Sequence, residues 1–387
     1  MRKLKLGAAG LGRAFSLMAE TFARDPRVEL VAAADPRPEA RRQFEIDFHG
    51  KSLASTEQLC ALRDVEAVYI ATPHQHHLED VLSACKAGKH VLVEKPMALS
   101  LDECRRMIDA ADRAGVKLVV GHSHSFDLPV LHAKKLIDSG AVGRVRMITA
   151  VNFTDFLYRP RRPEELDTTL GGGAVYNQAA HQVDVARLLA GGRVKSVRAM
   201  TGDWDASRPT EGAYAALLAF EDGAFASLAY SGYGHFDSDE FMDWVGELGQ
   251  KKNPEGYGAA RRALKGNEMD VKNSRNYGGN AYVGPGASFH QHFGTLIVSC
   301  EKADLRPLPG GVMVYADAEK RLDPLPAPKV PRAEVIDELY EAAVNGSAPL
   351  HDGAWAMATL EVCLAILESA RARKEIPLSH QTSASRT

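Results

Sequence analysis

The sequence predicts an α/β protein in two parts: an N-terminal Rossmann domain with a doubly wound parallel sheet, and a C-terminal α+β domain with a largely antiparallel open sheet. Within the first 120 residues, short apolar runs alternate with longer segments of helical period, as in βαβ units. A glycine-rich turn follows the first run. After about residue 125, long extended segments replace the alternation. We therefore expect domains over residues 1–124 and 125–378, and a flexible tail over 379–387.

The N-terminal strands are rich in Val, Leu, Ile and Ala, and their nearly continuous apolar character fits strands covered on both faces. They are expected at Leu4–Ala9, Val28–Ala34, Ala67–Ala71, His90–Val93 and Lys117–Val120. Helical periodicity predicts helices over Gln75–Ala87 and Leu101–Ala114.

The C-terminal part mixes long strands with helices. Strands are expected at Arg144–Phe156, Val194–Trp204, Tyr214–Glu221 and Ala224–Tyr230, and helices at Pro129–Ser139, Ala174–Leu189, Arg332–Asn345 and Gly353–Arg373. Asp222-Gly223 between two strands is a strong hairpin signal. Residues 246–286 hold nine glycines among many Lys, Asn and Arg, and we expect a long excursion with little core.

Composition excludes several classes of protein. The chain has 387 residues and a net charge of −3, which argues against a nucleic-acid binder that works through bulk positive charge. No run approaches the ~18 apolar residues of a membrane helix, and a motif that starts at Gly7 leaves no room for a signal peptide. The five cysteines are scattered and show no metal-ligand spacing, so we expect a cytoplasmic protein without metal.

The turn after the first strand carries the start of a dinucleotide fingerprint. Gly10 permits the tight turn, and Gly12 lets a pyrophosphate approach the amides of the helix that opens with Arg13 and Ala14. The third position is Phe15 rather than a small residue, so helix and strand must pack differently. A lone glycine pair is a weak signal and could be an ordinary turn.

The second strand strengthens the fingerprint because it ends at Asp35, 23 residues after Gly12. A carboxylate at this place binds ribose hydroxyls. Arg37 could accept a 2′-phosphate, but Asp35 would repel one, so the sequence favours NAD over NADP.

Three further motifs make the prediction specific: Ala71-Thr72-Pro73-His74-Gln75-His76-His77, Glu94-Lys95-Pro96, and the run Gly171–Asp184. With the fingerprint, they resemble the glucose–fructose oxidoreductase, inositol dehydrogenase and rhizopine-catabolism (Gfo/Idh/MocA) family, from Leu4 to about Arg373. The resemblance implies a catalytic Lys95 beside the nicotinamide and His181 facing the reacting hydroxyl. It also implies that Thr72, Pro73, His77 and Glu94 line the cofactor, and that the C-terminal sheet forms a homodimer or homotetramer.

One departure bears on the substrate. Sugar dehydrogenases of the family carry Asp where this chain has Asn177. Instead, the stretches Gly10–Phe15, His122–Asp127, Asn152–Glu165 and Tyr230–Glu240 resemble the phthalate 4,5-cis-dihydrodiol dehydrogenase branch. That branch implies NAD-dependent oxidation of a carboxylated cis-dihydrodiol to a catechol, where aromatisation supplies driving force.

The candidate substrate residues combine imidazoles with guanidinium groups that can grip a carboxylate in bidentate geometry. They are His122, His124, Arg159, Arg161, Arg162, Asn177 and His181. Two alternatives stay open: a sugar or inositol dehydrogenase of the same family, and a non-catalytic NAD-binding regulator, since fold does not fix function.

Overall fold

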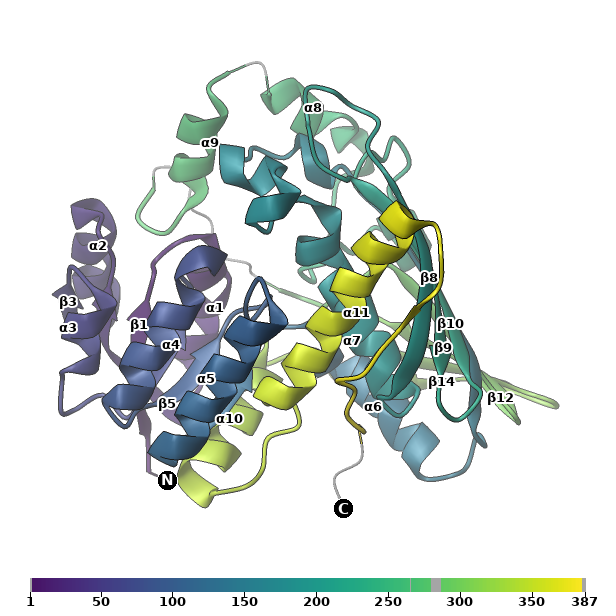
Figure 1. Ribbon diagram of the computed structural model, residues 1–387, viewed down its shortest axis with the longest axis horizontal. Helices are drawn as coiled ribbons and strands as arrows, with labels where there is room; N and C mark the ends of the chain where they lie inside the picture. Colours follow the sequence, from purple (N-terminus) through teal and green to yellow (C-terminus); the bar gives the residue numbers. More distant parts are fainter. Residues whose placement is uncertain (1, 265, 280–286, 385–387) are drawn as a thin grey trace. The chain divides into compact units, whose positions relative to one another are not determined.

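The computed structural model describes residues 2–264, 266–279 and 287–384, and the chain divides into two compact units (Figure 1). The first unit comprises Met1–His122, Met269–Pro285 and Val330–Met357. The second comprises Ser123–Glu268, Gly286–Lys329 and Ala358–Thr387.

The first segment of the first unit ends at His122, two residues before the predicted boundary at residue 124. The prediction that all later residues form one domain is wrong, because two later segments belong to the first unit. Two later segments return to the first unit because polar and aromatic side chains anchor them there. The Tyr340 hydroxyl donates to the Arg2 carbonyl at 2.7 Å, the Thr21 hydroxyl to the Pro331 carbonyl at 2.7 Å, and the Tyr277 hydroxyl to Asp47 at 2.6 Å. Hydrophobic periodicity carries no trace of such long-range contacts.

The first unit is built on a six-stranded parallel sheet in the order β3-β2-β1-β4-β5-β6, which confirms the predicted Rossmann fold. The strands are β1 (Leu4–Ala9), β2 (Val28–Ala34), β3 (Lys51–Leu53), β4 (Ala67–Ile70), β5 (His90–Val93) and β6 (Leu118–Val120). Only β3 was not predicted, because three residues at a sheet edge give too short a pattern. All six strands run in the same direction, so their carboxyl ends meet at one edge.

The helices of this unit include five that connect these strands and two that come from later in the chain. They are α1 (Arg13–Arg24), α2 (Pro38–Phe48), α3 (Thr56–Cys60), α4 (His77–Lys86), α5 (Leu101–Ala114), α9 (Glu268–Arg275) and α10 (Ala333–Asn345). Their ends follow local chemistry: α5 starts with a capping box, in which Ser100 and Glu103 each accept a backbone N–H of the other.

Phe15 occupies the third fingerprint position without opening the helix–strand interface. Its ring is fully buried and meets the Tyr277 ring edge-on, with centroids 4.9 Å apart. A contact with Phe22 at 6.3 Å continues the cluster. The larger residue is thus accommodated by an aromatic partner from a distant segment, which is the different packing that the sequence required.

The second unit is built on a nine-stranded sheet in the order β14-β13-β12-β11-β7-β10-β9-β8-β15. The strands are β7 (Val145–Phe153), β8 (Val194–Gly202), β9 (Ala213–Phe220), β10 (Phe225–Ser231), β11 (Thr295–Cys300), β12 (Ala303–Leu308), β13 (Gly311–Ala316), β14 (Lys320–Pro324) and β15 (Ile376–Pro377). Only the β7–β10 pair is parallel, so the predicted, largely antiparallel sheet is confirmed. The hairpin turns at Gly223 with φ of 89°. Strands β11 to β14 were not predicted; charged residues interrupt the apolar pattern in β12 and β14, but not in β11 and β13.

Helices cover one face of this sheet (Figure 1). The helices assigned to the unit are α6 (Leu128–Asp138), α7 (Ala180–Leu189), α8 (Ala259–Ala263) and most of α11 (Gly353–Ala372). A π-helical turn, Val175–Ala179, leads into α7, all ten residues of which are buried. By length and composition α11 could span a membrane, but 61% of its apolar window is buried inside the protein, as in a core helix.

The expectation for residues 246–286 needs correction in part. Glu268 accepts two hydrogen bonds from the buried Arg208 guanidinium at 2.8 and 2.9 Å, and Tyr277 is buried, so the segment is anchored where the sequence suggested little core. Residues 280–286 lie outside the described part of the chain.

The tail is predicted to be flexible, and as far as residue 384 the structure shows it held by hydrogen bonds. The Glu361 carboxylate accepts backbone N–H groups of Ser379 and His380 at 2.8 and 2.9 Å, and Gln381 donates to it at 2.7 Å. A polar tail looks frayed in sequence because its partners, here on α11, are not visible locally. Residues 385–387 lie outside the description.

Candidate active site

Five predicted residues lie at the carboxyl edge of the parallel sheet. Gly10 follows β1, Asp35 follows β2, Thr72 follows β4, Glu94 follows β5, and His122 follows β6. In open parallel sheets, ligands bind at this edge where the strand order reverses, here between β1 and β4.

The glycine turn fits a dinucleotide pyrophosphate. Gly10 has φ of 86°, and a Cβ there would lie 2.7 Å from the Ala71 carbonyl oxygen, so only glycine fits. A Cβ on Gly12 would meet nothing within 4 Å, which leaves open space above the start of α1. The first turn of α1, which begins with Arg13 and Ala14, holds no acidic residue. Its amides and dipole can therefore receive an anion.

Asp35 and Arg37 hold the glycine turn through hydrogen bonds to the Leu11 backbone. The buried Asp35 carboxylate accepts the Leu11 N–H at 2.8 Å and the Arg37 N–H and Nε at 2.8 and 3.0 Å. Arg37 Nη2 donates back to the Leu11 carbonyl at 2.7 Å. Arg37 Nη2 also donates to this carboxylate at 3.2 Å, so its roughly four acceptor sites are occupied, and a ribose hydroxyl would have to displace part of the Arg37 pairing.

His77 holds together two loops at the carboxyl edge of the parallel sheet. The ring is fully buried, with Nε2 3.0 Å from the Thr72 carbonyl and Nδ1 3.0 Å from the Pro96 carbonyl. It therefore ties the loop after β4 to the loop after β5, and Pro73 on the first of these loops stays partly exposed. Burial lowers the pKa of His77. Because the His77 ring has no exposed surface, a structural role in holding the two loops together fits it better than direct contact with the cofactor.

Glu94 is also a support. Its buried carboxylate accepts the Tyr69 hydroxyl at 2.6 Å and a backbone hydrogen bond from His122. Burial raises the pKa of Glu94 and that of Tyr69. The next residue, Lys95, is partly exposed, and its peptide bond to Pro96 is cis.

In the second unit, three rings form a cluster. His181, near the start of α7, contacts His124 with centroids 4.8 Å apart and Phe293 at 4.9 Å, and His124 contacts Phe293 at 5.0 Å. His124 Nδ1 lies 2.6 Å from the Asp127 carboxylate. Sequence reasoning missed Asp127, whose spacing of three from His124 was the available signal, and Phe293, for which there was none.

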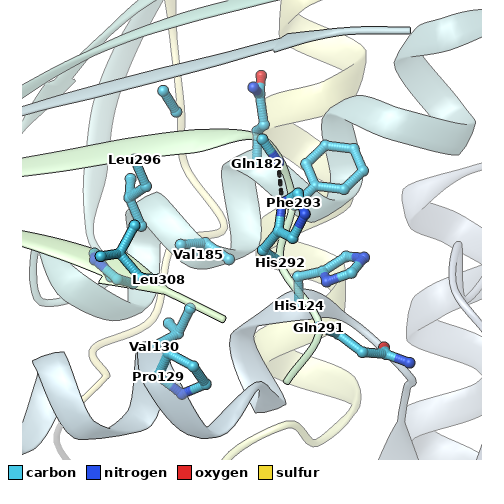
Figure 2. Close-up of a pocket in the computed structure, with 13 residues that line it drawn as sticks. His124, Pro129, Val130, Gln182, Val185, Gln291, His292, Phe293, Leu296 and Leu308 are labelled. Carbon is cyan, nitrogen blue, oxygen red and sulfur yellow. Dashed lines mark hydrogen bonds between the residues drawn. The ribbon is translucent and has the colours of Figure 1, made fainter. Parts of the chain in front are cut away.

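A small cavity adjoins this cluster (Figure 2). Its volume of about 30 Å³ is room for one or two water molecules. His124, Gln291 and His292 supply polar groups, while Val130 and Leu296 are among its apolar walls. His292 is fixed by the backbone, since Nε2 donates to the Val245 carbonyl at 2.8 Å and Nδ1 accepts the Gly294 N–H at 3.2 Å.

The three predicted arginines have different partners. Arg159 pairs with Asp155 at 3.0 Å and with Glu247 at 3.7 Å. Arg162 pairs with Glu164 at 3.0 Å and with Glu165 at 3.8 Å.

Arg161 differs from both neighbours. Its guanidinium stacks 3.6 Å from the Phe156 ring centroid and donates to the Phe156 carbonyl at 2.7 Å. Burial lowers the pKa of Arg161 to about 10; the Glu165 carboxylate opposes this shift, and the like charges of Arg159 and Arg208 add to it. Among the described residues, no carboxylate lies within ion-pair distance of this guanidinium.

Aromatic contacts connect Arg161 with the histidine cluster. Phe156 meets Tyr230 at 6.4 Å, Tyr230 stacks parallel to Phe293 at 6.2 Å, and Phe293 meets His181. A second connection is electrostatic. Burial opposes ionisation of Glu247, but Arg159 and His124 both act to lower the pKa of its carboxyl group.

The Asn177 side chain forms hydrogen bonds with the backbone of the loop that precedes it. Its amide nitrogen donates to the Gly173 carbonyl at 2.8 Å and to the Gly171 carbonyl at 3.2 Å. A carboxylate in this position would face two carbonyl oxygens with no hydrogen to donate. The local backbone therefore favours Asn over the Asp of sugar dehydrogenases.

Within residues 2–264, 266–279 and 287–384, no group of three or more His, Cys, Asp or Glu side chains is placed to hold a metal ion.

A Rossmann unit with a glycine turn, a buried carboxylate after the second strand and a partly exposed lysine at one sheet edge is typical of a dinucleotide-dependent oxidoreductase. The comparisons agree. Residues 4–122 match the model of an oxidoreductase family with an NAD-binding Rossmann fold, and residues 130–250 match the GFO/IDH/MocA C-terminal domain. The chain belongs to the Gfo/Idh/MocA oxidoreductase family and is an NAD(P)-dependent enzyme.

Two relatives cover almost the whole chain. It is 51% identical over 377 residues to 1-carboxy-3-chloro-3,4-dihydroxycyclohexa-1,5-diene dehydrogenase of Comamonas testosteroni, with 95% of each chain covered. It is 44% identical to a proposed dehydrogenase from Bordetella bronchiseptica RB50, whose crystal structure superposes with a TM-score of 0.92 over 97% of this chain and 100% of that one.

A more distant structure supports the fold alone. The WlbA dehydrogenase from Bordetella pertussis, crystallised with NADH and UDP-GlcNAcA, is 24% identical, with a TM-score of 0.68 and 98% of each chain covered.

Proposed function

We propose that the enzyme oxidises a carboxylated cyclohexadiene cis-diol to a catechol with NAD in the breakdown of aromatic compounds. The name of the 51%-identical relative supports a substrate of this class. The observation that carries the proposal is Arg161, a partly buried cation without a carboxylate within ion-pair distance in the described chain. Glu165 and Glu268 act on this charge only from beyond ion-pair distance, so a substrate carboxylate could pair directly with the guanidinium in bidentate geometry.

The roles of the reacting groups follow from their chemistry. Lys95 takes the hydroxyl proton, and His181 holds the same hydroxyl through a ring nitrogen. Bound NAD supplies the acceptor for the hydride that leaves the carbinol carbon. The resulting ketone tautomerises to the aromatic catechol, so the product provides part of the driving force.

The number of carboxylate groups on the substrate distinguishes two versions of this proposal. The sequence suggested the dicarboxylate of a phthalate 4,5-cis-dihydrodiol, whereas the relative's name gives one carboxyl group. Arg159 and Arg162 already pair with carboxylates, so the arginine segment favours one carboxylate over two. Inhibition by benzoate and by phthalate, each in competition with the substrate, tests this number. Benzoate should inhibit more strongly. Stronger inhibition by phthalate would instead support a dicarboxylated diol as the substrate.

The sugar and regulator alternatives make different predictions. A sugar dehydrogenase needs an acidic partner for its histidine, and Asn177 donates to carbonyls instead. The test is a screen of NAD reduction with carboxylated cis-diols, neutral cis-diols, inositol and free sugars, with the product identified by mass spectrometry. Catechol from the carboxylated diol supports the proposal. Turnover of sugars alone contradicts it, and binding of NAD without any turnover points to the regulator.

We further infer that copies associate through the outer face of the nine-stranded sheet and that the enzyme works in the cytoplasm. The face opposite the helices exposes Met147, Leu217, Phe225 and Ile297 between small neutral residues. In register, Met147 lies beside Phe225, and Leu217 lies beside Ser227. An exposed apolar patch of this kind is typical of an interface. The five cysteines are all free, which fits a reducing compartment.

A further inference from the structure

A buried carboxylate lies behind the histidine pair of the second unit. Asp127 is 5% exposed, and it accepts a hydrogen bond from His124 Nδ1 at 2.6 Å. The His124 ring contacts the His181 ring at 4.8 Å with the planes 74° apart. Carboxylate, first imidazole and second imidazole are therefore contiguous.

The turn that carries His124 is fastened to the helix that carries His181. The Ser125 hydroxyl donates to Asp184, three residues after His181 on α7, and the other Asp184 oxygen accepts the Thr359 hydroxyl at 3.0 Å. Residues three apart on a helix share a face. The bond from Ser125 therefore fixes the His124 turn against the part of α7 that presents His181.

The carboxylate also selects the tautomer of His124. Because an ionised carboxylate can only accept, Nδ1 carries the hydrogen, and a second proton can enter only at Nε2. In general, a carboxylate beside an imidazole favours the protonated form of the ring. Other charged groups around it are Glu247 and His292, together with Arg159, which pairs with Glu247.

We propose that Asp127 and His124 form a positioning pair that sets the orientation and proton affinity of His181. This inference rests on the proposed function, in which Lys95 takes the hydrogen of the substrate hydroxyl and His181 donates a ring N–H to its oxygen. Asn177 cannot perform this task, because its amide is engaged with loop carbonyls. The pair thus supplies the carboxylate that residue 177 lacks.

The kinetic test compares Asp127→Asn and His124→Gln with the wild type, using NAD and the carboxylated diol. Without the carboxylate, the protonated ring of His181 is less favoured, so the limb of the kcat profile that reports His181 should move to lower pH by roughly half a unit or more. The kcat plateau should fall about tenfold or more, with KM within about twofold. The control is His380→Gln, which breaks another imidazole–carboxylate pair, to Glu361 at 2.9 Å, and should leave kcat and its profile unchanged. If the pH profile of kcat is unchanged in both Asp127→Asn and His124→Gln, the proposed role of the Asp127–His124 pair is wrong.

A second measurement needs no substrate and separates this inference from the proposed function. Long-range ¹H–¹⁵N spectra of the imidazoles should show His124 protonated at Nδ1 in the wild type. In Asp127→Asn the titration midpoint of His181, assigned with His181→Gln, should fall. An identical His181 titration in wild type and Asp127→Asn overturns the pair even where the diol is oxidised. If Asp127→Asn does not fold, the same comparison with His124→Gln decides. Failure of every diol as substrate would refute the proposed function and leave this spectroscopic result intact.

Discussion

The three arginines of residues 159–162 differ in their partners, and this difference is open to direct test. Arg161→Gln keeps a polar side chain but removes the charge that we assign to the substrate carboxylate. A charge-assisted hydrogen bond contributes about 1.5–3 kcal/mol, so KM for the carboxylated diol should rise roughly tenfold to a hundredfold. KM for a neutral cis-diol should stay nearly constant. Steady-state kinetics on both substrates measure this.

Arg162→Gln is the matched control, because it removes a guanidinium that already pairs with Glu164. It should change KM for the carboxylated diol no more than about twofold, the usual scale of an exposed pair. Equal losses in the two variants would mean that the segment acts through general positive charge.

Lys95 carries the proton transfer in the proposed reaction. Lys95→Ala should lower turnover by roughly a hundredfold or more, the scale for losing a general base. NAD affinity should change far less, because the glycine turn and Asp35 hold the nucleotide. Lys86→Ala, at an exposed position on α4, is the control and should retain full turnover. Near-normal turnover of Lys95→Ala would remove this lysine from the mechanism.

At this scale the sequence indicated which residue types gather, but not their roles. The fingerprint, Lys95 and His181 are recognisable because their motifs are local. His77 and Glu94 proved to be buried braces, since their bonds to Thr72, Pro96 and Tyr69 come from separate loops and strands. Phe293 lies more than a hundred residues from His181 along the chain, and no local pattern connects the two.

Among the elements, the loop between β2 and α2 should set cofactor choice. Asp35 holds negative charge beside the ribose site, and Arg37 is engaged with that carboxylate and with the Leu11 carbonyl. A 2′-phosphate would face the carboxylate and would have to recruit Arg37 away from it. The wild-type enzyme should therefore show higher kcat/KM with NAD than with NADP. Equal or reversed efficiencies would show that Arg37 dominates.

The C-terminal tail should stabilise the second unit. Arg187 on α7 is fully buried, and burial lowers its pKa to about 10. Its guanidinium donates to Gln381 at 3.2 Å and to the Thr382 hydroxyl at 3.3 Å. Deleting residues 379–387 removes both acceptors and should cost roughly 2–4 kcal/mol of unfolding free energy. Urea titration measures the loss.

Deleting only residues 385–387 keeps these acceptors and serves as the control for that titration. A midpoint that is unchanged by the longer deletion would show that the tail adds no stability.

Elements with strong periodicity were predictable, as β1, β2, β5, α6 and the β9–β10 hairpin show. Short strands such as β3 and β11 to β14 were not, because tertiary pairing rather than local pattern decides them. The same reason explains the tail, whose order depends on Glu361 and Arg187.

For the whole molecule, the outer sheet face should hold copies together. Leu217→Glu places a charge among exposed apolar side chains and should convert the assembly to monomers with little loss of folded structure. Light scattering after size-exclusion chromatography reads the mass directly. Lys195→Glu, an exposed position on β8, is the charge control. A wild-type chain that is already monomeric would refute the interface.

The central claim is that the enzyme selects a cyclohexadiene cis-diol by its carboxylate. The most direct measurement is the ratio of kcat/KM for a carboxylated cis-diol to that for its methyl ester, with NAD as acceptor. Because the ester has the same ring and diol but no charge, only recognition of the carboxylate separates the two substrates. The account predicts a ratio of roughly a hundred, and a ratio near one would contradict it.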